Sequence, residues 1–267
     1  MTSDSSKPLA GRIALVTGAT RGIGEAVALG LAKAGAHVIA VGRTQGALEA
    51  LDDAILQATG ERATLVPLDL REPDGLDHLG AAIHQRWGKL DILVGAAGVL
   101  GPLTPVSHLE PKGWDMIVST NLTANWRLIR AMDPLLRASD AGRAVFFSSS
   151  VAKTRPAFWG AYAATKAFVL ALGEALHDEF RPHGVVVTTL CPGHTATGFD
   201  AAAGATITPL LRLLTMKPRP VAESGIGALL RGKATVIAGL PNRMAAFSNR
   251  LTSRAMQRAT LRRIMGS

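Results

Sequence analysis

The stretch that decides the fold is Ile13-Ala-Leu-Val-Thr17, followed directly by Gly18-Ala-Thr-Arg-Gly-Ile-Gly24. Its first five residues form a short apolar run that is typical of a buried strand. Three glycines follow at the spacing Gly-x-x-x-Gly-x-Gly, and a helical pattern then continues through Ala34. The pattern predicts a buried strand, a tight turn and a helix whose first amides are free to bind an anion.

The same alternation of strand and helix continues along the chain. The expected strands are 13–17, 37–41, 63–68, 91–95, 144–148, 185–190 and 235–238. The expected later helices are 45–58, 73–87, 110–137, 162–181, 210–214 and 220–230, with a terminal helix from about residue 241. Apolar, non-alternating strands separated by helices predict a doubly wound α/β fold, with a mainly parallel, seven-stranded sheet covered on both faces. Ligands of such folds bind beyond the carboxyl ends of the strands.

Length and composition predict one domain. The chain has 267 residues, 48% of them hydrophobic, which is enough for one large core. We expect residues 1–10 to be a disordered N-terminus and residues 11–240 to be the folded domain. The irregular stretch 195–219 is expected to be a substrate-binding lid. Residues 241–267 are expected to form a basic, helical C-terminal extension.

Charge is distributed unevenly. The net charge is +9, and residues 224–267 contain no Asp or Glu but eight Lys and Arg. This asymmetry indicates an acidic partner, such as a phosphate, an anionic surface or another subunit.

Cysteine usage and hydropathy bear on the compartment. Cys191 is the only cysteine, and no Cys/His cluster has the spacing of a metal site. The N-terminus lacks the apolar run of a secretion signal, and no segment approaches the roughly 20 apolar residues that cross a bilayer. We therefore expect a cytoplasmic protein without a metal.

Tyr162, the only tyrosine, is followed four residues later by Lys166 in Gly160-Ala-Tyr-Ala-Ala-Thr-Lys166. On a helix this spacing places the phenol and the ammonium on one face. A nearby cation lowers a tyrosine pKa, ordinarily about 10, by roughly 1–3 units. Such a phenol can give a proton to a carbonyl oxygen or take one from an alcohol. The alternative is that Tyr162 packs one end of an amphipathic helix while Lys166 extends to water.

Together these features resemble the short-chain dehydrogenase/reductase family. The Gly-rich turn, the Tyr162/Lys166 pair and Cys191-Pro-Gly-His-Thr-Ala-Thr197 occur in the family's order and spacing, over about residues 10–240. The resemblance implies a Rossmann-type oxidoreductase domain with a nicotinamide cofactor. It also implies that Tyr162 is the proton donor and acceptor, and that Lys166 binds the nicotinamide ribose and lowers the tyrosine pKa.

The resemblance implies two further catalytic residues. The family's serine lies thirteen residues before the tyrosine and polarises the substrate oxygen, which selects Ser149 from Ser148-Ser149-Ser150, with Ser150 as the alternative. Asn121 matches the helix asparagine that holds a water joining the lysine to solvent. Because Asn is a poor residue for a helix interior, we expect a kink at Asn121.

One segment departs from the family. The usual Asn-Asn-Ala-Gly reads Gly95-Ala96-Ala97-Gly98 here. The close backbone approach to the cofactor is retained, but the support that the asparagine side chains give to the sheet must come from elsewhere.

The resemblance assigns the remaining cofactor contacts. Asp69 and Leu70 match the adenine pocket, and the segment after Cys191 matches the one that holds the nicotinamide carboxamide. The expected cofactor-binding residues are Gly18, Thr20, Arg21, Gly22, Ile23, Gly24, Arg43, Thr44, Asp69, Leu70, Ala96, Ala97, Gly98, Tyr162, Lys166, Pro192, Gly193, Thr195 and Thr197.

The end of the second strand favours NADP(H). An NAD enzyme places an acid there to bind the ribose hydroxyls. The sequence reads Val41-Gly42-Arg43-Thr44, without an acid. Guanidinium groups pair bidentately with phosphate, so Arg21 and Arg43 suit a 2′-phosphate. The alternative is two solvated surface arginines.

We therefore expect an NADPH-dependent carbonyl reductase or alcohol dehydrogenase. It would transfer hydride between the nicotinamide and a ketone, aldehyde or secondary alcohol, and the apolar stretch 198–218 favours a hydrophobic one. One alternative is a non-catalytic NADP(H)-binding sensor or scaffold with the same fold. Another is association of the basic C-terminus with nucleic acid or an anionic membrane.

The helix of Tyr162 has a second apolar face, which needs a partner beyond the sheet. The resemblance implies a homodimer or homotetramer through this helix. The second face consists of Ala164, Phe168, Ala171 and Ala175.

The C-terminal arginines follow each other in four-residue steps, which drift around a helix. Phe247 and Leu251 consequently fall on the same side as the middle arginines. We therefore expect a solvated or subunit-facing tail, and neither a membrane anchor nor nucleic-acid binding. The arginines concerned are Arg250, Arg254, Arg258 and Arg262.

Overall fold

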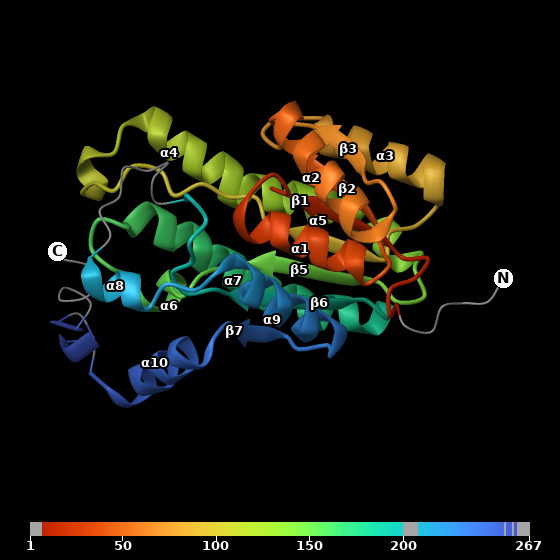
Figure 1. The fold of residues 1–267 in the computed structure, drawn as a ribbon. Coiled ribbons are helices and arrows are strands. Elements are labelled where there is room, and N and C mark those ends of the chain that lie inside the picture. Colours follow the sequence, from red (N-terminus) through yellow and green to blue (C-terminus); the bar gives the residue numbers. More distant parts are fainter. Residues whose placement is uncertain (1–6, 200–207, 254, 258, 261–267) are drawn as a thin grey trace.

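The computed structural model describes residues 7–199, 208–253, 255–257 and 259–260. These residues form a doubly wound α/β fold on one sheet (Figure 1). Seven strands lie in the order β3-β2-β1-β4-β5-β6-β7, and all neighbouring pairs are parallel. The predicted fold class is therefore confirmed. The strands are β1 Ile13–Thr17, β2 His37–Gly42, β3 Thr64–Pro67, β4 Ile92–Gly95, β5 Arg143–Phe147, β6 Val186–Cys191 and β7 Thr235–Ile237.

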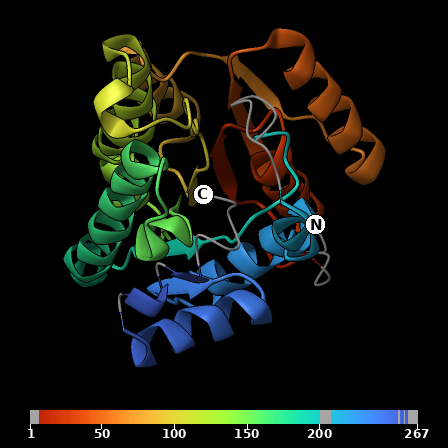
Figure 2. The same cartoon turned by 90° about the vertical axis from the view of Figure 1, so that its left-hand side faces the viewer.

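Helices cover both faces of the sheet (Figure 2). They are α1 Gly22–Lys33, α2 Gln45–Thr59, α3 Gly75–Trp87, α4 Pro111–Val118, α5 Ala124–Arg137, α6 Val151–Thr154, α7 Gly160–Phe180, α8 Pro209–Leu213, α9 Pro218–Leu230 and α10 Leu240–Leu251, with 3-10 turns η1 Val106–His108 and η3 Arg181–His183 and a π-helical turn η2 Ser119–Thr123.

Strand β1 shows how one apolar run supplies two cores. Successive side chains of a strand point to opposite faces. Ala14 and Val16 accordingly pack in the core beneath α1, α2 and α9. Ile13 and Leu15 pack in the other core, beneath α3, α5 and α7. A strand buried on both faces has no solvent-facing position, which is why polar and apolar residues do not alternate along the run.

The topology places a ligand site. β1 is bordered by β2 on one side and by β4 on the other. The order in which successive strands are added to the sheet therefore reverses at β1, which makes it the topological switch point. The loops that leave the carboxyl ends of these strands diverge to opposite faces and leave a crevice between them. The Gly-rich turn after β1 and the segment Gly95–Gly98 after β4 both lie at this crevice.

The long predicted helix 110–137 has an internal distortion. It consists of α4 and α5 joined through η2, in which the backbone takes π-helical form. Asn121 lies in the middle of this turn and is fully buried. The distortion expected at Asn121 is thus present, as a π-helical turn.

Two short elements were not predicted, namely η1 and α6, because neither is long enough to show a hydrophobic period. Residues 8–11 form a turn in which Leu9 is buried and its N–H donates to the Ala34 carbonyl. The end of the stretch 1–10, which was expected to be disordered, thus packs on the domain.

Residues 1–6, and 200–207 of the expected lid, lie outside the described residues. No helix among the residues described has the length and hydropathy needed to span a bilayer.

Candidate active site

A cavity of about 760 Å³ opens beyond the carboxyl ends of the strands. It brings together predicted site residues from seven separate segments of the sequence. Gly22, Thr44 and Asn121 are predicted site residues that are not in its lining. The predicted residues that line the cavity are Gly18, Thr20, Arg21, Ile23, Gly24, Arg43, Asp69, Leu70, Ala96, Ala97, Gly98, Ser149, Ser150, Tyr162, Lys166, Pro192, Gly193, Thr195 and Thr197.

The Gly-rich turn forms one wall of the cavity. Gly18 has a φ angle of +65°, and a Cβ there would lie 2.8 Å from the Ala97 Cα. A Cβ on Gly24 would collide with the Gly18 carbonyl oxygen. Only glycine therefore permits α1 to begin so close to β1 and β4. The first amides of α1 have no side-chain cap, and they provide an anion site at the cavity wall.

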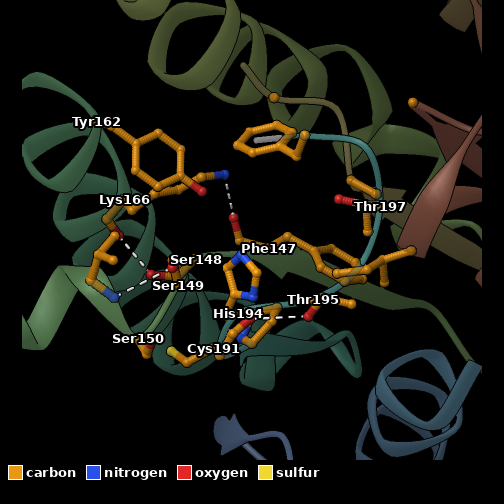
Figure 3. A pocket seen from close by; sticks show the side chains of 18 of the residues that line it. Phe147, Ser148, Ser149, Ser150, Tyr162, Lys166, Cys191, His194, Thr195 and Thr197 are labelled. Atoms are coloured by element: carbon orange, nitrogen blue, oxygen red, sulfur yellow. Dashed lines mark hydrogen bonds between the residues drawn. The ribbon is translucent and has the colours of Figure 1, made fainter. Parts of the chain in front are cut away.

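Tyr162 and Lys166 lie one turn apart on α7, and both are buried. The Lys166 ammonium donates a 2.8 Å hydrogen bond to the Phe147 carbonyl oxygen and lies 5.7 Å from the centre of the Tyr162 ring. Burial lowers the pKa of Lys166 to about 8. Figure 3 shows both side chains on the same side of the pocket as the three serines, opposite Thr195 and Thr197.

Two aromatic rings flank the Tyr162 ring. Trp159 makes an edge contact with a centroid distance of 6.1 Å, and Phe199 makes a tilted contact at 5.9 Å. Such contacts fix the plane of the ring without using its hydroxyl. Tyr162 therefore packs against other side chains, as the alternative reading of the Tyr162/Lys166 pair expected. This packing lies inside the cavity and beside Lys166, which is buried and does not extend to water.

The three serines after β5 have different environments. Ser148 is buried, and its hydroxyl donates to the Lys166 carbonyl at 2.7 Å. Ser150 precedes α6, and its N–H donates to the Pro192 carbonyl at 2.8 Å. The Ser149 oxygen accepts a 3.3 Å bond from the Val151 N–H. As an acceptor in that bond, the Ser149 hydroxyl retains its own hydrogen for a ligand oxygen.

Asn121 acts behind the cavity wall. Its side-chain oxygen accepts from the Val99 N–H at 2.8 Å, and its amide donates to the Val99 carbonyl at 2.8 Å. The same amide donates to the Thr165 hydroxyl at 3.2 Å, and Thr165 lies next to Lys166 on α7. Asn121 therefore ties the loop after β4 to the helix of the Tyr162/Lys166 pair.

Asn125 was not predicted as a site residue. It packs at Gly95, where the sequence departs from the family's asparagine. It is buried, its amide donates to the Asn121 carbonyl at 2.7 Å, and its side-chain oxygen would lie 3.0 Å from a Cβ on Gly95. Asn125 thus packs against the position where the family carries an asparagine. The signal that could have revealed it is the same as for Asn121: an asparagine within a helix, one turn later.

Arginines border the cavity near the end of β2. Arg21 and Arg43 are exposed and line the cavity. Asp69 is engaged by Arg71, whose Nη2 lies 2.6 Å from a carboxylate oxygen. These hydrogen bonds hold the pKa of Asp69 below its usual value. The carboxylate expected at the adenine pocket is therefore ionised and oriented by a neighbour.

The far end of the cavity was not predicted in detail. Its apolar lining comes from the segments around α6, α8 and α10: Val151, Pro156, Trp159, Phe199, Leu211, Leu214, Ala245, Ala246 and Phe247. Polar groups of the lining come from Lys153, His194, Asn242, Arg243 and Gln257. The His194 Nδ1 is 2.7 Å from the Thr215 hydroxyl. Among the described residues, no group of three or more His, Cys, Asp or Glu could hold a metal ion.

The doubly wound sheet and a glycine turn that opens an uncapped helix define a dinucleotide-binding protein. Comparison with known proteins narrows this class. The model of the family described as short chain dehydrogenase matches residues 12–207. An uncharacterized oxidoreductase of Escherichia coli K12, YciK, is 37% identical over 200 residues, which are 74% of this chain and 79% of that protein. The chain therefore belongs to the short chain dehydrogenase family.

Two further relatives agree with this assignment. A 3beta-hydroxysteroid dehydrogenase of Mediterraneibacter gnavus is 32% identical over 228 residues, 85% of this chain and 81% of that protein. A crystal structure of a short chain dehydrogenase from Escherichia coli CFT073, complexed with NADPH, superposes with a TM-score of 0.78 at 33% identity. The match covers 87% of this chain and 98% of that chain.

The buried ammonium makes a prediction about stability. The pKa of Lys166 falls from 10.5 to about 8 on folding, so keeping it charged at pH 7 costs about 3 kcal/mol. Since the unfolded chain binds more protons between these two values, wild-type stability rises over this interval. Lys166→Met removes the charge at the expense of one hydrogen bond, worth about 1 kcal/mol. We expect a Tm several degrees above wild type at pH 7, with the difference shrinking as pH rises from 8 to 10.

Differential scanning fluorimetry of the two cofactor-free proteins at pH 7, 8, 9 and 10 measures this difference. Lys233→Met, at an exposed lysine outside the cavity, is the control and should show no such pH trend. A Lys166→Met protein that is less stable than wild type at pH 7, or whose Tm difference from wild type is constant with pH, would contradict the expectation that Lys166 is buried in its charged form at pH 7 and loses its proton near pH 8.

Proposed function

We propose that this protein is an NADPH-dependent carbonyl reductase, reversible as an alcohol dehydrogenase. The substrate would be a ketone, an aldehyde or, in reverse, a secondary alcohol. The observation that supports this most strongly is the meeting of Tyr162, Lys166 and Ser149 in the same cavity as the uncapped start of α1. A dinucleotide held at that helix start would supply the hydride.

The residues of the cavity fit NADP(H). Amides at the start of α1 suit a diphosphate, and the small residues Ala96, Ala97 and Gly98 leave room for a flat ligand along the wall. Arg21 and Arg43 supply two guanidinium groups for a 2′-phosphate, and no carboxylate follows β2 to bind ribose hydroxyls instead. The complex of the Escherichia coli CFT073 relative with NADPH supports the same choice.

The chain's own residues account for the proton chemistry. Tyr162 would donate its proton to the substrate oxygen, because its hydroxyl belongs to a buried phenol beside an ammonium. Lys166 would stabilise the phenolate that is left. Ser149 would hold the substrate oxygen by donating its hydroxyl hydrogen. Asn121 would position Lys166 through Thr165 and keep the cavity wall in place.

The lining supports a hydrophobic substrate. Trp159, Phe199, Leu211, Leu214 and Phe247 line the cavity, and the first two contact the Tyr162 ring. Apolar walls favour a ring or an acyl chain over a small polar compound, because burying apolar surface is the main source of binding free energy there. The 3beta-hydroxysteroid dehydrogenase among the relatives is consistent with a large apolar substrate.

We also propose that the protein forms a homodimer or homotetramer through α7. Val169, Leu176 and Phe180 are buried against the sheet. Ala164 and Ala171, on the second face of the helix, are exposed. Small exposed residues allow another helix to approach closely.

Turnover of carbonyl compounds tests the function. The purified protein is mixed with NADPH or NADH and a panel of aliphatic, aromatic and cyclic ketones and aldehydes, and cofactor oxidation is followed at 340 nm. We expect turnover of at least one hydrophobic carbonyl compound, faster with NADPH. Tight NADPH binding without turnover of any compound in either direction would instead favour the non-catalytic sensor or scaffold.

The serine assignment predicts a difference between two neighbours. Ser149→Ala removes the donor to the substrate oxygen, so kcat/KM should fall roughly 10²–10³-fold. Ser150→Ala is the matched control, because the hydrogen bond from Ser150 to the Pro192 carbonyl uses its backbone N–H, which alanine keeps. Steady-state kinetics on the best substrate of the panel measure both. The reverse order of effects would transfer the role to Ser150.

A further inference from the structure

Helix α10 presents an apolar stripe to solvent. Leu240, Met244 and Phe247 are 69%, 64% and 62% exposed, and their spacing of four and three residues places them on one face of the helix. We call these three residues the α10 stripe. A soluble helix normally turns such a stripe toward the core. In α10 the orientation is reversed, so the stripe is available to a partner.

A second apolar residue group lies close to the stripe. Leu213 of α8 is 81% exposed, and its neighbours Leu211 and Leu214 line the same cavity as Phe247. Helices α8 and α10 lie at the same end of the molecule in Figure 1. The exposed apolar residues of α8 and α10 therefore lie next to residues that line the cavity.

The charge around the stripe has one sign. Arg243 lies between Leu240 and Met244 in the sequence and is exposed, and Arg212 is exposed on α8. Residues 224–267 contain eight Lys and Arg and no Asp or Glu. An amphipathic helix with apolar residues on one face, basic residues around it and no acids matches the composition of helices that lie in the interface of an anionic bilayer.

We propose that the α10 stripe docks on an anionic phospholipid bilayer. The apolar residues would enter the acyl boundary and the arginines would pair with lipid phosphates. A second copy of the chain fits less well, because a two-fold contact places a surface against itself and would oppose two basic segments. A nucleic acid would pair with the arginines but would leave the apolar stripe exposed.

The exposed fractions revise an expectation from the sequence. The four-residue steps of the arginines predicted a solvated or subunit-facing tail, because they placed Phe247 and basic residues on one side. In the structure α10 ends at Leu251, and among the side chains of α10 that the structure describes, the exposed large apolar ones belong to its first two turns. The stripe therefore lies before Arg250 in the sequence, and Arg243 is the one basic residue within it.

Docking would also determine how substrate arrives. Phe247 belongs both to the α10 stripe and to the cavity lining. A docked protein would hold the far end of its cavity at the lipid surface, so an apolar carbonyl compound could enter from the bilayer. This consequence rests on the proposed reductase function, whereas docking itself does not.

Vesicle flotation tests the docking directly. The full-length protein is mixed with phosphatidylcholine vesicles that contain either no anionic lipid or about 30% phosphatidylglycerol. We expect binding to the anionic vesicles at least about 10-fold stronger than to the neutral ones, and weaker binding as salt rises from about 50 to about 500 mM. Leu240→Ser/Met244→Ser should reduce binding to the anionic vesicles at least about 10-fold. Neither residue lines the cavity.

Leu230→Ser is the matched control, since it removes an exposed leucine from the end of α9 and should bind as wild type does. Equal binding by the double variant, or no binding to anionic vesicles, overturns the proposal. Light scattering identifies the contact as one between copies if the double variant dissociates an oligomer without any loss of lipid binding. A gel-shift with double-stranded DNA that persists in the double variant, in the absence of vesicle binding, would indicate nucleic acid.

The effect on catalysis separates the two proposals. With a water-soluble substrate from the panel, Leu240→Ser/Met244→Ser should retain wild-type kcat/KM. With a lipophilic ketone dissolved in anionic vesicles, its rate should fall several-fold relative to wild type. Unchanged rates in vesicles refute delivery through the bilayer, and loss of binding with intact soluble turnover refutes neither the reductase function nor the fold.

Discussion

Tyr162→Phe is expected to reduce carbonyl compounds roughly 10²–10⁴-fold more slowly than wild type, with little change in NADPH affinity. The substitution removes only the hydroxyl. The ring would keep its contacts with Trp159 and Phe199, and the Lys166 ammonium would keep its bond to the Phe147 carbonyl. The loss would therefore come from proton transfer and not from the fold.

Three measurements on one preparation separate these contributions. Stopped-flow kinetics with the best substrate give the rate, fluorescence titration gives the Kd for NADPH, and thermal unfolding gives the Tm. We expect a large loss in kcat together with an unchanged Kd and Tm. A Tyr162→Phe protein with most of its wild-type kcat would remove the proposed proton donor, and the sequence contains no other tyrosine to replace it.

Cofactor choice should respond strongly to the arginines near the end of β2. Arg43→Asp removes a guanidinium and places a carboxylate where the 2′-phosphate is expected. A charge-assisted hydrogen bond is worth about 1.5–3 kcal/mol, and the added acid would repel the phosphate and accept from ribose hydroxyls. We expect kcat/KM with NADPH to fall at least about 100-fold and kcat/KM with NADH to rise, because the two contributions act in opposite directions on the two cofactors.

The control variant, Arg86→Asp, makes the same change of charge at a residue outside the cavity. Arg86 is exposed at the end of α3 and does not line the cavity, so Arg86→Asp should leave the ratio of the two cofactors unchanged. If Arg43→Asp behaves as Arg86→Asp does, Arg43 is a solvated surface residue. Combining Arg43→Asp with Arg21→Ser then tests whether Arg21 alone recognises the phosphate.

Much of the fold was predictable because its signals are local. The run Ile13–Thr17 is apolar throughout since β1 is buried on both faces, and that feature alone distinguishes a parallel sheet from a half-exposed one. The predicted strands agree with the observed ones to within about two residues, which is the usual uncertainty of an element's ends. The short helix α6 was missed because four residues cannot show a period.

The site residues were predictable where the spacing within one motif fixes their relative positions. The spacing of Tyr162 and Lys166 places both on one face of a helix, and the glycines before α1 are required by sterics. The structural support of Gly95 by Asn125 depends on a contact between residues thirty positions apart, so the sequence offered only a weak hint. The contribution of α10 to the cavity likewise depends on how the chain returns after β7.

The sequence was least informative about which face of α10 is turned toward solvent. In the sequence, Phe247 and Leu251 fall on the same side as the middle arginines, so the segment is not cleanly amphipathic, and its pattern does not tell whether Met244 faces the core or solvent. The structure shows Met244 exposed, and this exposure is the observation from which we propose docking on an anionic bilayer.

The most direct test of the proposed reaction is the fate of deuterium from NADPH that carries deuterium at both C4 positions of the nicotinamide, so that hydride transfer from either face is labelled. Wild-type protein, labelled cofactor and the best carbonyl substrate are incubated, and the alcohol is examined by mass spectrometry and NMR. We predict one deuterium on the carbinol carbon in the wild-type product, and almost none formed in the same time by Tyr162→Phe. Product without deuterium, or equal amounts of labelled product formed by both proteins in the same time, would contradict hydride transfer assisted by Tyr162.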